Sequence, residues 1–240
     1  MTTHEQYNAE LIFISSCCTQ FIFFSSYCTE LIFISSYGTQ LIFISNYGKL
    51  LICTCSYSRQ LIVFSSYCKQ LTFISSSSTQ LSFISSYVTL LICICSYGTQ
   101  LIFFSSYCKQ IIFIPSYCTQ FIVFSSYSTE LIFISSFCTE LIFTSSYFKV
   151  LIFFSNYCTQ LIFFSSSSTL LVFISSFDKL LICIYIHYTK LILFSSYCTQ
   201  LIFIATFCKD FIFFSSYFTV LILSQVTLQR KSSSLVKMQS

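Results

Sequence analysis

Apolar and polar positions follow one another along this chain with a fixed period of ten residues. From Leu11 to about Ser224 the decapeptide Leu-Ile-Phe-Ile-Ser-Ser-Tyr-Cys-Thr-Gln recurs about 22 times without a gap, and an apolar residue opens every unit. A fixed period of this length is typical of repeat architectures and not of globular enzymes. The pattern divides the chain into a polar leader at 1–10, an array at 11–224 and a basic tail at 225–240, which we expect to be disordered.

The order of residue types within the unit predicts strands. Its first four places hold strong strand formers, and good helix formers are scarce. Ten residues make about 2.8 helical turns, so the apolar stripe of a helix would drift. The Ser-Ser pair at places five and six and Thr-Gln at nine and ten are suitable corners. We therefore predict an all-β, parallel β-solenoid of about 22 ten-residue coils, a rod of roughly 100 Å at a coil spacing of about 4.8 Å.

The alternation of side chains predicts an exposed apolar surface. Leu and Phe at places one and three point to one side of a strand, and the two Ile at places two and four point to the other. The interior has room for one set, so the other forms an apolar face of several hundred Å² along the rod. No terminal unit reads as the polar cap that solenoids normally carry. These features predict that the chain associates with itself.

The composition leaves two alternatives to a soluble solenoid. The hydrophobic fraction is 55% while the charged fraction is only 8%, so we expect poor solubility. Residues 70–108 and 150–177 carry no charge and are long enough to span a bilayer as helices. Each ten residues also hold several Ser, Thr, Gln and Asn, which oppose insertion. A transmembrane or membrane-associated chain and an aggregated low-complexity chain are therefore the alternatives.

Positive charge is spread thinly over the array. The net charge is +4, and the cations fall mostly on the ninth place, at Lys49, Arg59, Lys69, Lys109, Lys149, Lys179 and Lys209. Only the first three lie in adjacent units. A solvated corner explains this pattern, and we expect no nucleic-acid partner.

Cysteine usage follows the repeat. Nine of the fifteen cysteines fill the eighth place: Cys18, Cys28, Cys68, Cys108, Cys118, Cys138, Cys158, Cys198 and Cys208. No secretory signal is visible at the N-terminus, so we expect the reducing cytoplasm, with a membrane as the alternative, and free thiols. The pairs Cys53-x-Cys55 and Cys93-x-Cys95 lack a nearby His or a matching second pair, so we predict no metal site.

Catalytic chemistry is poorly represented. The two histidines are His4 in the leader and His187 in the most divergent unit, Leu181 to Lys190, and the one close acidic pair is Glu130 and Glu140. A nucleophile needs a base and an orienting group within hydrogen-bond reach. With three glycines in the whole chain, no phosphate-binding loop is present. We predict no enzyme, no catalytic residue, no cofactor and no small-molecule substrate.

Differences between units follow the genetic code more closely than they follow side-chain chemistry. The eighth place holds Cys, Gly, Ser, Val, Phe, Tyr and Asp, which are linked by single-base steps around one codon. A selected core is expected to resist Asp178 or Gly38 at such a place. One hypothesis is therefore a translated 30-base minisatellite with no selected activity.

Two functional hypotheses stand beside it. Segments such as Leu-Ile-Phe-Ile-Ser-Ser combine high β propensity, low charge and no Pro, which favours a structural or adhesive filament. The ten-residue period and the tyrosines are also similar to those of midge-type antifreeze solenoids, a resemblance that implies binding to ice or another ordered surface. The regular Cys and Gly spacing of that family is absent here.

Overall fold

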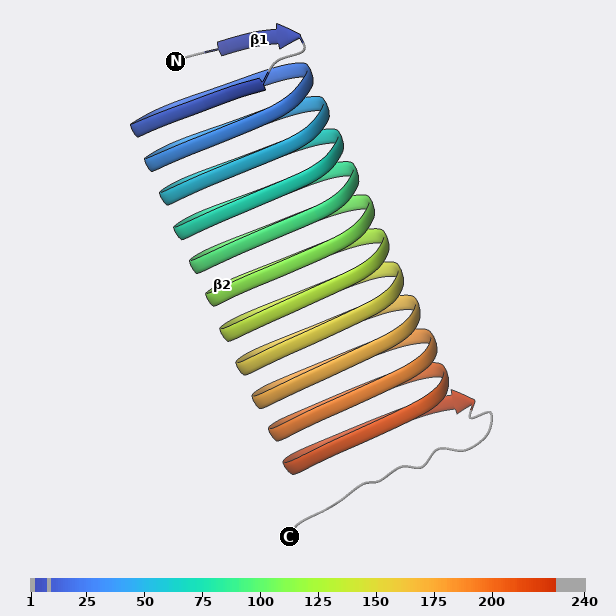
Figure 1. Ribbon diagram of the computed structural model, residues 1–240. Coiled ribbons are helices and arrows are strands. Elements are labelled where there is room, and N and C mark those ends of the chain that lie inside the picture. The colour runs from blue at the N-terminus through green and yellow to red at the C-terminus, as the bar shows by residue number, and fades with distance from the viewer. Residues whose placement is uncertain (1–2, 8–9, 228–240) are drawn as a thin grey trace.

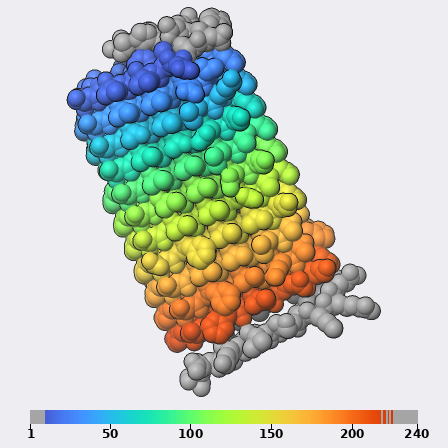
Figure 2. Space-filling model, in the orientation of Figure 1, coloured from blue at the N-terminus to red at the C-terminus, as the bar shows by residue number. Residues whose placement is uncertain are grey.

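The chain winds into an all-β rod, seen in the computed structural model, which describes residues 3–7 and 10–227 (Figure 1). β1 spans Thr3–Tyr7, and β2 spans Glu10–Thr227 as one continuous winding strand. Figure 2 shows successive coils as closely packed bands across the rod. The predicted parallel β-solenoid is confirmed.

Each coil contains twenty residues rather than ten. The rings of Tyr27 and Tyr47 stack with centroids 4.8 Å apart. Gln20 Nε2 donates a hydrogen bond to Gln40 Oε1 at 3.2 Å, again across twenty residues. One coil therefore takes two decapeptides, and the expected 22 coils become about eleven. At a spacing of about 4.8 Å the rod is roughly 50 Å long, half the predicted length.

The size of the inward side chains explains the longer coil. In a twenty-residue coil two units lie opposite each other, and their third-place rings meet across the interior. Phe103 and Phe113 pack edge to face at 5.9 Å, as do Phe33 and Phe43 at 5.3 Å. Facing sheets about 10 Å apart accommodate two such rings. A coil half as long has too narrow an interior for them.

Four places of each unit point inward. In the unit from 131 to 140 the buried residues are Leu131, Phe133, Ser135 and Cys138, at places one, three, five and eight. Two consecutive outward residues occur at places six and seven and again at nine and ten, so the chain turns there. The first corner thus begins one place later than predicted, and Leu with Phe form the inward set.

Local hydrogen bonds support both turns. The fifth-place hydroxyl of Ser105 donates a hydrogen bond to the backbone carbonyl oxygen of Tyr107 at 3.0 Å. The eighth-place thiol of Cys108 donates one to the backbone carbonyl oxygen of Gln110 at 3.5 Å. The same pair of contacts recurs in the unit from 151 to 160. Ser side chains that bond to nearby backbone favour turns over straight strands, which is consistent with Ser at the inward place directly before the first turn.

The leader adds to the stack. β1 pairs in parallel with β2, with Thr3 opposite Ile22 and Tyr7 opposite Tyr27, and the register shifts between Glu5 and Tyr7. The polar sequence Thr-His-Glu-Gln-Tyr therefore forms an additional rung at this end, where we expected no polar cap. Of the predicted disordered tail, 225–227 belong to β2 and 228–240 lie outside the described residues.

The uncharged stretches at 70–108 and 150–177 both lie within β2. In the part of the chain that the structure describes, no helix has the length and apolar character needed to cross a membrane.

Candidate functional surface

The twenty-residue coil places odd and even units on opposite faces of the rod. Units that begin at 11, 31, 51 and every twenty residues onward form one face, with mostly Ile at the fourth place; we call it the isoleucine face. Units that begin at 21, 41, 61 and onward form the other, with Phe as the most frequent residue at that place; we call it the phenylalanine face. These faces are the front and back runs of each coil in Figure 1.

Both faces carry a column of exposed apolar side chains. On the isoleucine face Ile134 is 42% exposed, and on the phenylalanine face Phe104 is 40% exposed. The Phe104 and Phe124 rings stack at 4.9 Å and 5°. The second-place Ile residues lie half-buried beside these columns. Each face is therefore an apolar ribbon with a repeat equal to the coil spacing.

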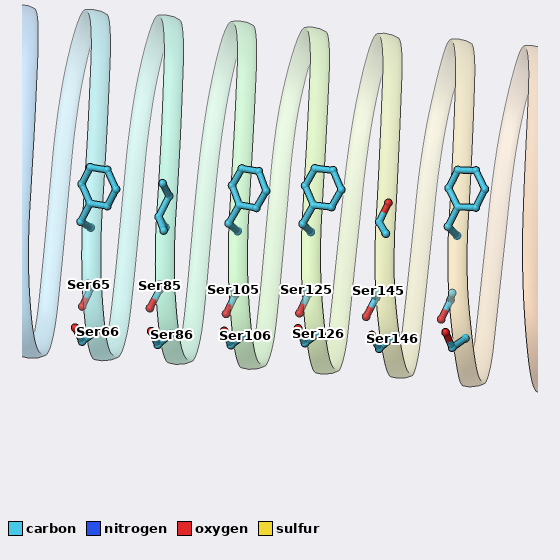
Figure 3. Close-up of a pocket in the computed structure, with 18 of the residues that line it drawn as sticks. Ser65, Ser66, Ser85, Ser86, Ser105, Ser106, Ser125, Ser126, Ser145 and Ser146 are labelled. Carbon is cyan, nitrogen blue, oxygen red and sulfur yellow. The ribbon is translucent and has the colours of Figure 1, made fainter.

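A shallow groove follows the apolar column of the phenylalanine face. It has a volume of about 770 Å³ and lies between the fourth-place side chains and the serine pairs at places five and six, such as Ser105 and Ser106 (Figure 3). A smaller groove of about 200 Å³ on the isoleucine face includes Pro115. The residues lining both grooves are uncharged. Several of the fifth-place hydroxyls, Ser105 among them, already donate to backbone carbonyls, so the grooves offer hydroxyl rows without an acid or base.

Places six to ten form the two narrow edges of the rod. The even units build the lysine edge, named for Lys49, Lys69, Lys109, Lys149 and Lys209, and the odd units build the threonine edge, where the ninth place is mostly Thr. Seven tyrosines of the lysine edge stack with centroids 4.7 to 5.1 Å apart: Tyr27, Tyr47, Tyr67, Tyr87, Tyr107, Tyr127 and Tyr147. A similar ladder of Tyr and Phe runs along the threonine edge from Tyr97 to Tyr217.

The threonine edge also carries amide ladders. Side-chain hydrogen bonds join Gln20, Gln40, Gln60 and Gln80 in sequence. A second run joins Gln100 to Gln120 and Gln120 to Glu140, each at 3.0 Å. Amide ladders of this kind stabilise parallel, in-register stacks.

Burial makes several of the inward thiols weaker acids, although the hydrogen bond from Cys53 lowers the pKa of the Cys55 thiol. Burial raises the pKa of Cys68, Cys95 and Cys108 to about 12. The thiolate is the reactive form and the metal ligand, so these residues stay protonated at neutral pH. The Sγ atoms of Cys53 and Cys55 lie 3.9 Å apart. Among the described residues, no group of three or more His, Cys, Asp or Glu is arranged to hold a metal ion.

Asp178 is a buried carboxyl group at the eighth place. Its side chain is fully buried, Ser195 Oγ donates to Oδ2 at 3.5 Å, and Oδ1 has no hydrogen-bond partner. Burial raises its pKa from 3.8 to about 7, although the nearby hydroxyls of Ser175 and Ser195 oppose the shift. Perturbed carboxyl groups are common in active sites, but this one faces the closed interior of the rod.

The divergent unit adds two buried phenols beside Asp178. Tyr185 and Tyr188 pack with ring centroids 4.3 Å apart, and neither hydroxyl has a hydrogen-bond partner. Burial raises the pKa of both phenols well above 10. His187 lies outside on the lysine edge, with its ring 5.0 Å from that of Phe207.

The acidic pair singled out in the sequence is separated in space. Glu130 belongs to the lysine edge and accepts a hydrogen bond from Gln110, while Glu140 belongs to the threonine edge and accepts one from Gln120. His4 lies in β1. What the described surface offers is apolar columns, hydroxyl rows, amide ladders and a row of lysines. Comparison of this chain with family models, curated proteins and solved structures found no match.

Proposed function

We propose that this chain is a non-catalytic structural protein that associates with copies of itself through its two apolar faces. The observation that carries the proposal is the column of fourth-place side chains on each face, exposed by about 40% at Phe104 and Ile134. Soluble monomers rarely expose continuous apolar surface of more than a few hundred Å². Covering these columns with a second copy removes that surface from water, at roughly 25 cal/mol per Å².

The geometry favours an open assembly over a closed dimer. The two apolar faces lie on opposite sides of the rod, so a copy bound to one face leaves the other available. An interface that does not close on itself produces extended assemblies. Flat sheets pack face to face about 10 Å apart, and side chains repeating at one spacing can interdigitate as in cross-β structures. We expect layered bundles of rods.

The eighth place favours a second hypothesis, the translated minisatellite. This place points into the core, yet it accommodates Asp178, Tyr188, Phe148, Gly98 and many Cys. A core under selection for packing resists such changes in size and charge. In that case the same association is aggregation of an unselected product. Detection of the endogenous chain by mass spectrometry would favour the structural role, and repeated failure to detect it would favour the minisatellite.

A matched pair of double variants tests the association. Phe104→Lys with Phe124→Lys adds two charges to the apolar column, and Ser106→Lys with Ser126→Lys adds the same two charges to the exposed sixth-place serines, where the lysine edge begins beside that column. Sedimentation velocity should show the first variant shifting to monomers or small oligomers, with the second remaining largely assembled. Equal sedimentation of the two variants would contradict the proposal that the apolar column mediates association.

A further inference from the structure

The twenty-residue coil sorts the cations that the decapeptide period leaves scattered. Lys49, Lys69, Lys109, Lys149 and Lys209 all fall on even units, so they form one row along the lysine edge. The threonine edge receives only Arg59 and Lys179 at the same place. The five lysines are exposed. From Lys49 to Lys149 the row covers five coil steps, roughly 24 Å.

Apolar side chains accompany the lysines. The tenth place of the lysine edge holds the half-buried residues Leu50, Leu90, Val150 and Leu170, whereas the threonine edge holds mostly Gln there. The acids on the lysine edge are Glu10 and Glu30 before the row, Glu130 within it and Asp210 beyond it, and Lys190 adds one more cation. Between Glu30 and Glu130 the edge therefore carries three lysines and no acid.

The tyrosine ladder indicates what kind of anion this edge suits. Its rings lie parallel, with interplanar angles of 2° to 9°, so each ring face is covered by the next ring. Nucleic-acid bases bind aromatic residues by stacking on exposed ring faces. In this tyrosine ladder the neighbouring tyrosines already cover the ring faces, so few are left on which a base could stack. Tyrosine side chains have an apolar ring and a polar hydroxyl group, and they are instead enriched at the interface between lipid and water.

We propose that the lysine edge between Tyr47 and Val150 binds the surface of an anionic lipid bilayer. The ammonium groups would contact phosphate and carboxylate headgroups, and the neighbouring Leu and Val side chains would reach the upper acyl region, as in other basic and apolar interfacial surfaces. This goes beyond self-association and does not depend on it, because the edge is separate from the two apolar faces.

Flotation of the full chain with lipid vesicles tests the proposal. Vesicles of phosphatidylcholine alone are compared with vesicles containing 30% phosphatidylserine, so that bound protein rises and unbound aggregate sinks. Lys69→Gln with Lys109→Gln removes two charges from the lysine edge, and Arg59→Gln with Lys179→Gln removes the same two from the threonine edge. At about fivefold per lysine near the surface, the first variant should bind anionic vesicles about 25-fold more weakly. The second should bind within about twofold of the unchanged chain.

Three results would overturn the proposal. They are equal losses in the two double variants, equal binding of the unchanged chain to both kinds of vesicle, and displacement from anionic vesicles by a stoichiometric single-stranded oligonucleotide. The last result would assign the edge to nucleic acid. Sedimentation of the same variants without lipid separates a change in self-association from a change in lipid binding.

Discussion

Two regions of the rod are built from the same decapeptide but differ in their interiors. The first comprises the coils between Gly98 and Phe163, and the second is the coil that contains Asp178 and Tyr188. In the first region inward rings stack across coils, as Phe143 and Phe163 do at 5.0 Å and 7°. In the second, a carboxyl group and two phenols are buried with unpaired oxygen atoms, whereas the unpaired buried atoms of the first region are two serine hydroxyls. Burying a polar atom without a partner costs about 1 to 3 kcal/mol, and more for a charge. The second region is therefore the weak coil of the rod.

The comparison shows which places hold a coil in register. The divergent unit keeps Leu181 and Cys183 buried at places one and three, and Leu191 opens the next unit in the same way. The backbone ladder of β2 runs through it without a break. Places one and three, together with the backbone pairing, are thus sufficient for winding. Places five and eight decide how stable the wound coil is, and local stability varies accordingly along the rod.

The largest expected effect comes from removing the buried carboxyl group. The pKa of Asp178 is about 7 in the folded chain and 3.8 as its ordinary value, so between these pH values the folded chain holds a proton that the unfolded chain releases. The free energy of unfolding therefore falls as pH rises through this window. Above the window the whole loss, about 4 kcal/mol, is present. Asp178→Ser should recover most of this at pH 8 and little at pH 3.5, measured by denaturant unfolding in the Phe104→Lys, Phe124→Lys background, which we expect to be less associated.

Two controls sharpen that result. Asp210→Ser removes an exposed carboxyl group and serves as the matched control for the loss of one carboxyl group from the chain. Cys138→Asp places a carboxyl group at the same buried place in the regular region and should create a second weak coil. Identical pH profiles before and after Asp178→Ser would contradict the burial of this residue.

A smaller effect is expected from the buried phenols. Tyr188→Phe keeps the ring and removes a hydroxyl that has no partner, so it should raise the free energy of unfolding by about 1 to 3 kcal/mol. Tyr107→Phe makes the same change in the outer ladder and should have almost no effect. Thermal unfolding of both variants measures the difference, and a loss of stability in Tyr188→Phe would show that its hydroxyl is bonded.

The smallest effect concerns the amide ladder of the threonine edge. Leu180 occupies the ladder place between Gln160 and Gln200 in the weak coil. Leu180→Gln should restore hydrogen bonds to both neighbours and raise stability by about 0.5 to 1 kcal/mol, the usual net value of such bonds. Gln120→Leu should cost a similar amount in the regular region, where both bonds are present. A rise in Tm for the first variant and a fall for the second would agree with this.

The strand type and the parallel stack could be predicted because they depend on residue types that recur at every tenth position. The coil length could not, because ten-residue and twenty-residue coils both place each residue above one of its own kind. Only the volume of facing rings such as Phe33 and Phe43 distinguishes them. The separation of Lys49 from Arg59 onto different edges depends on the coil length. The lysine row therefore could not be predicted from the sequence either. Asp178 is conspicuous in the sequence by its chemistry, but its hydrogen bond to Ser195 appears only in the fold.

A distance between two labels on the lysine edge tests the twenty-residue coil most directly. Nitroxide labels on ketone-bearing amino acids in place of Lys109 and Lys209 avoid the fifteen cysteines, and dilution with unlabelled chain removes contacts between molecules. Double electron–electron resonance should give a distance near 24 Å, because 100 residues make five coils at about 4.8 Å. A distance near 48 Å would mean ten-residue coils and would contradict the two faces, the two edges and the proposals that depend on them.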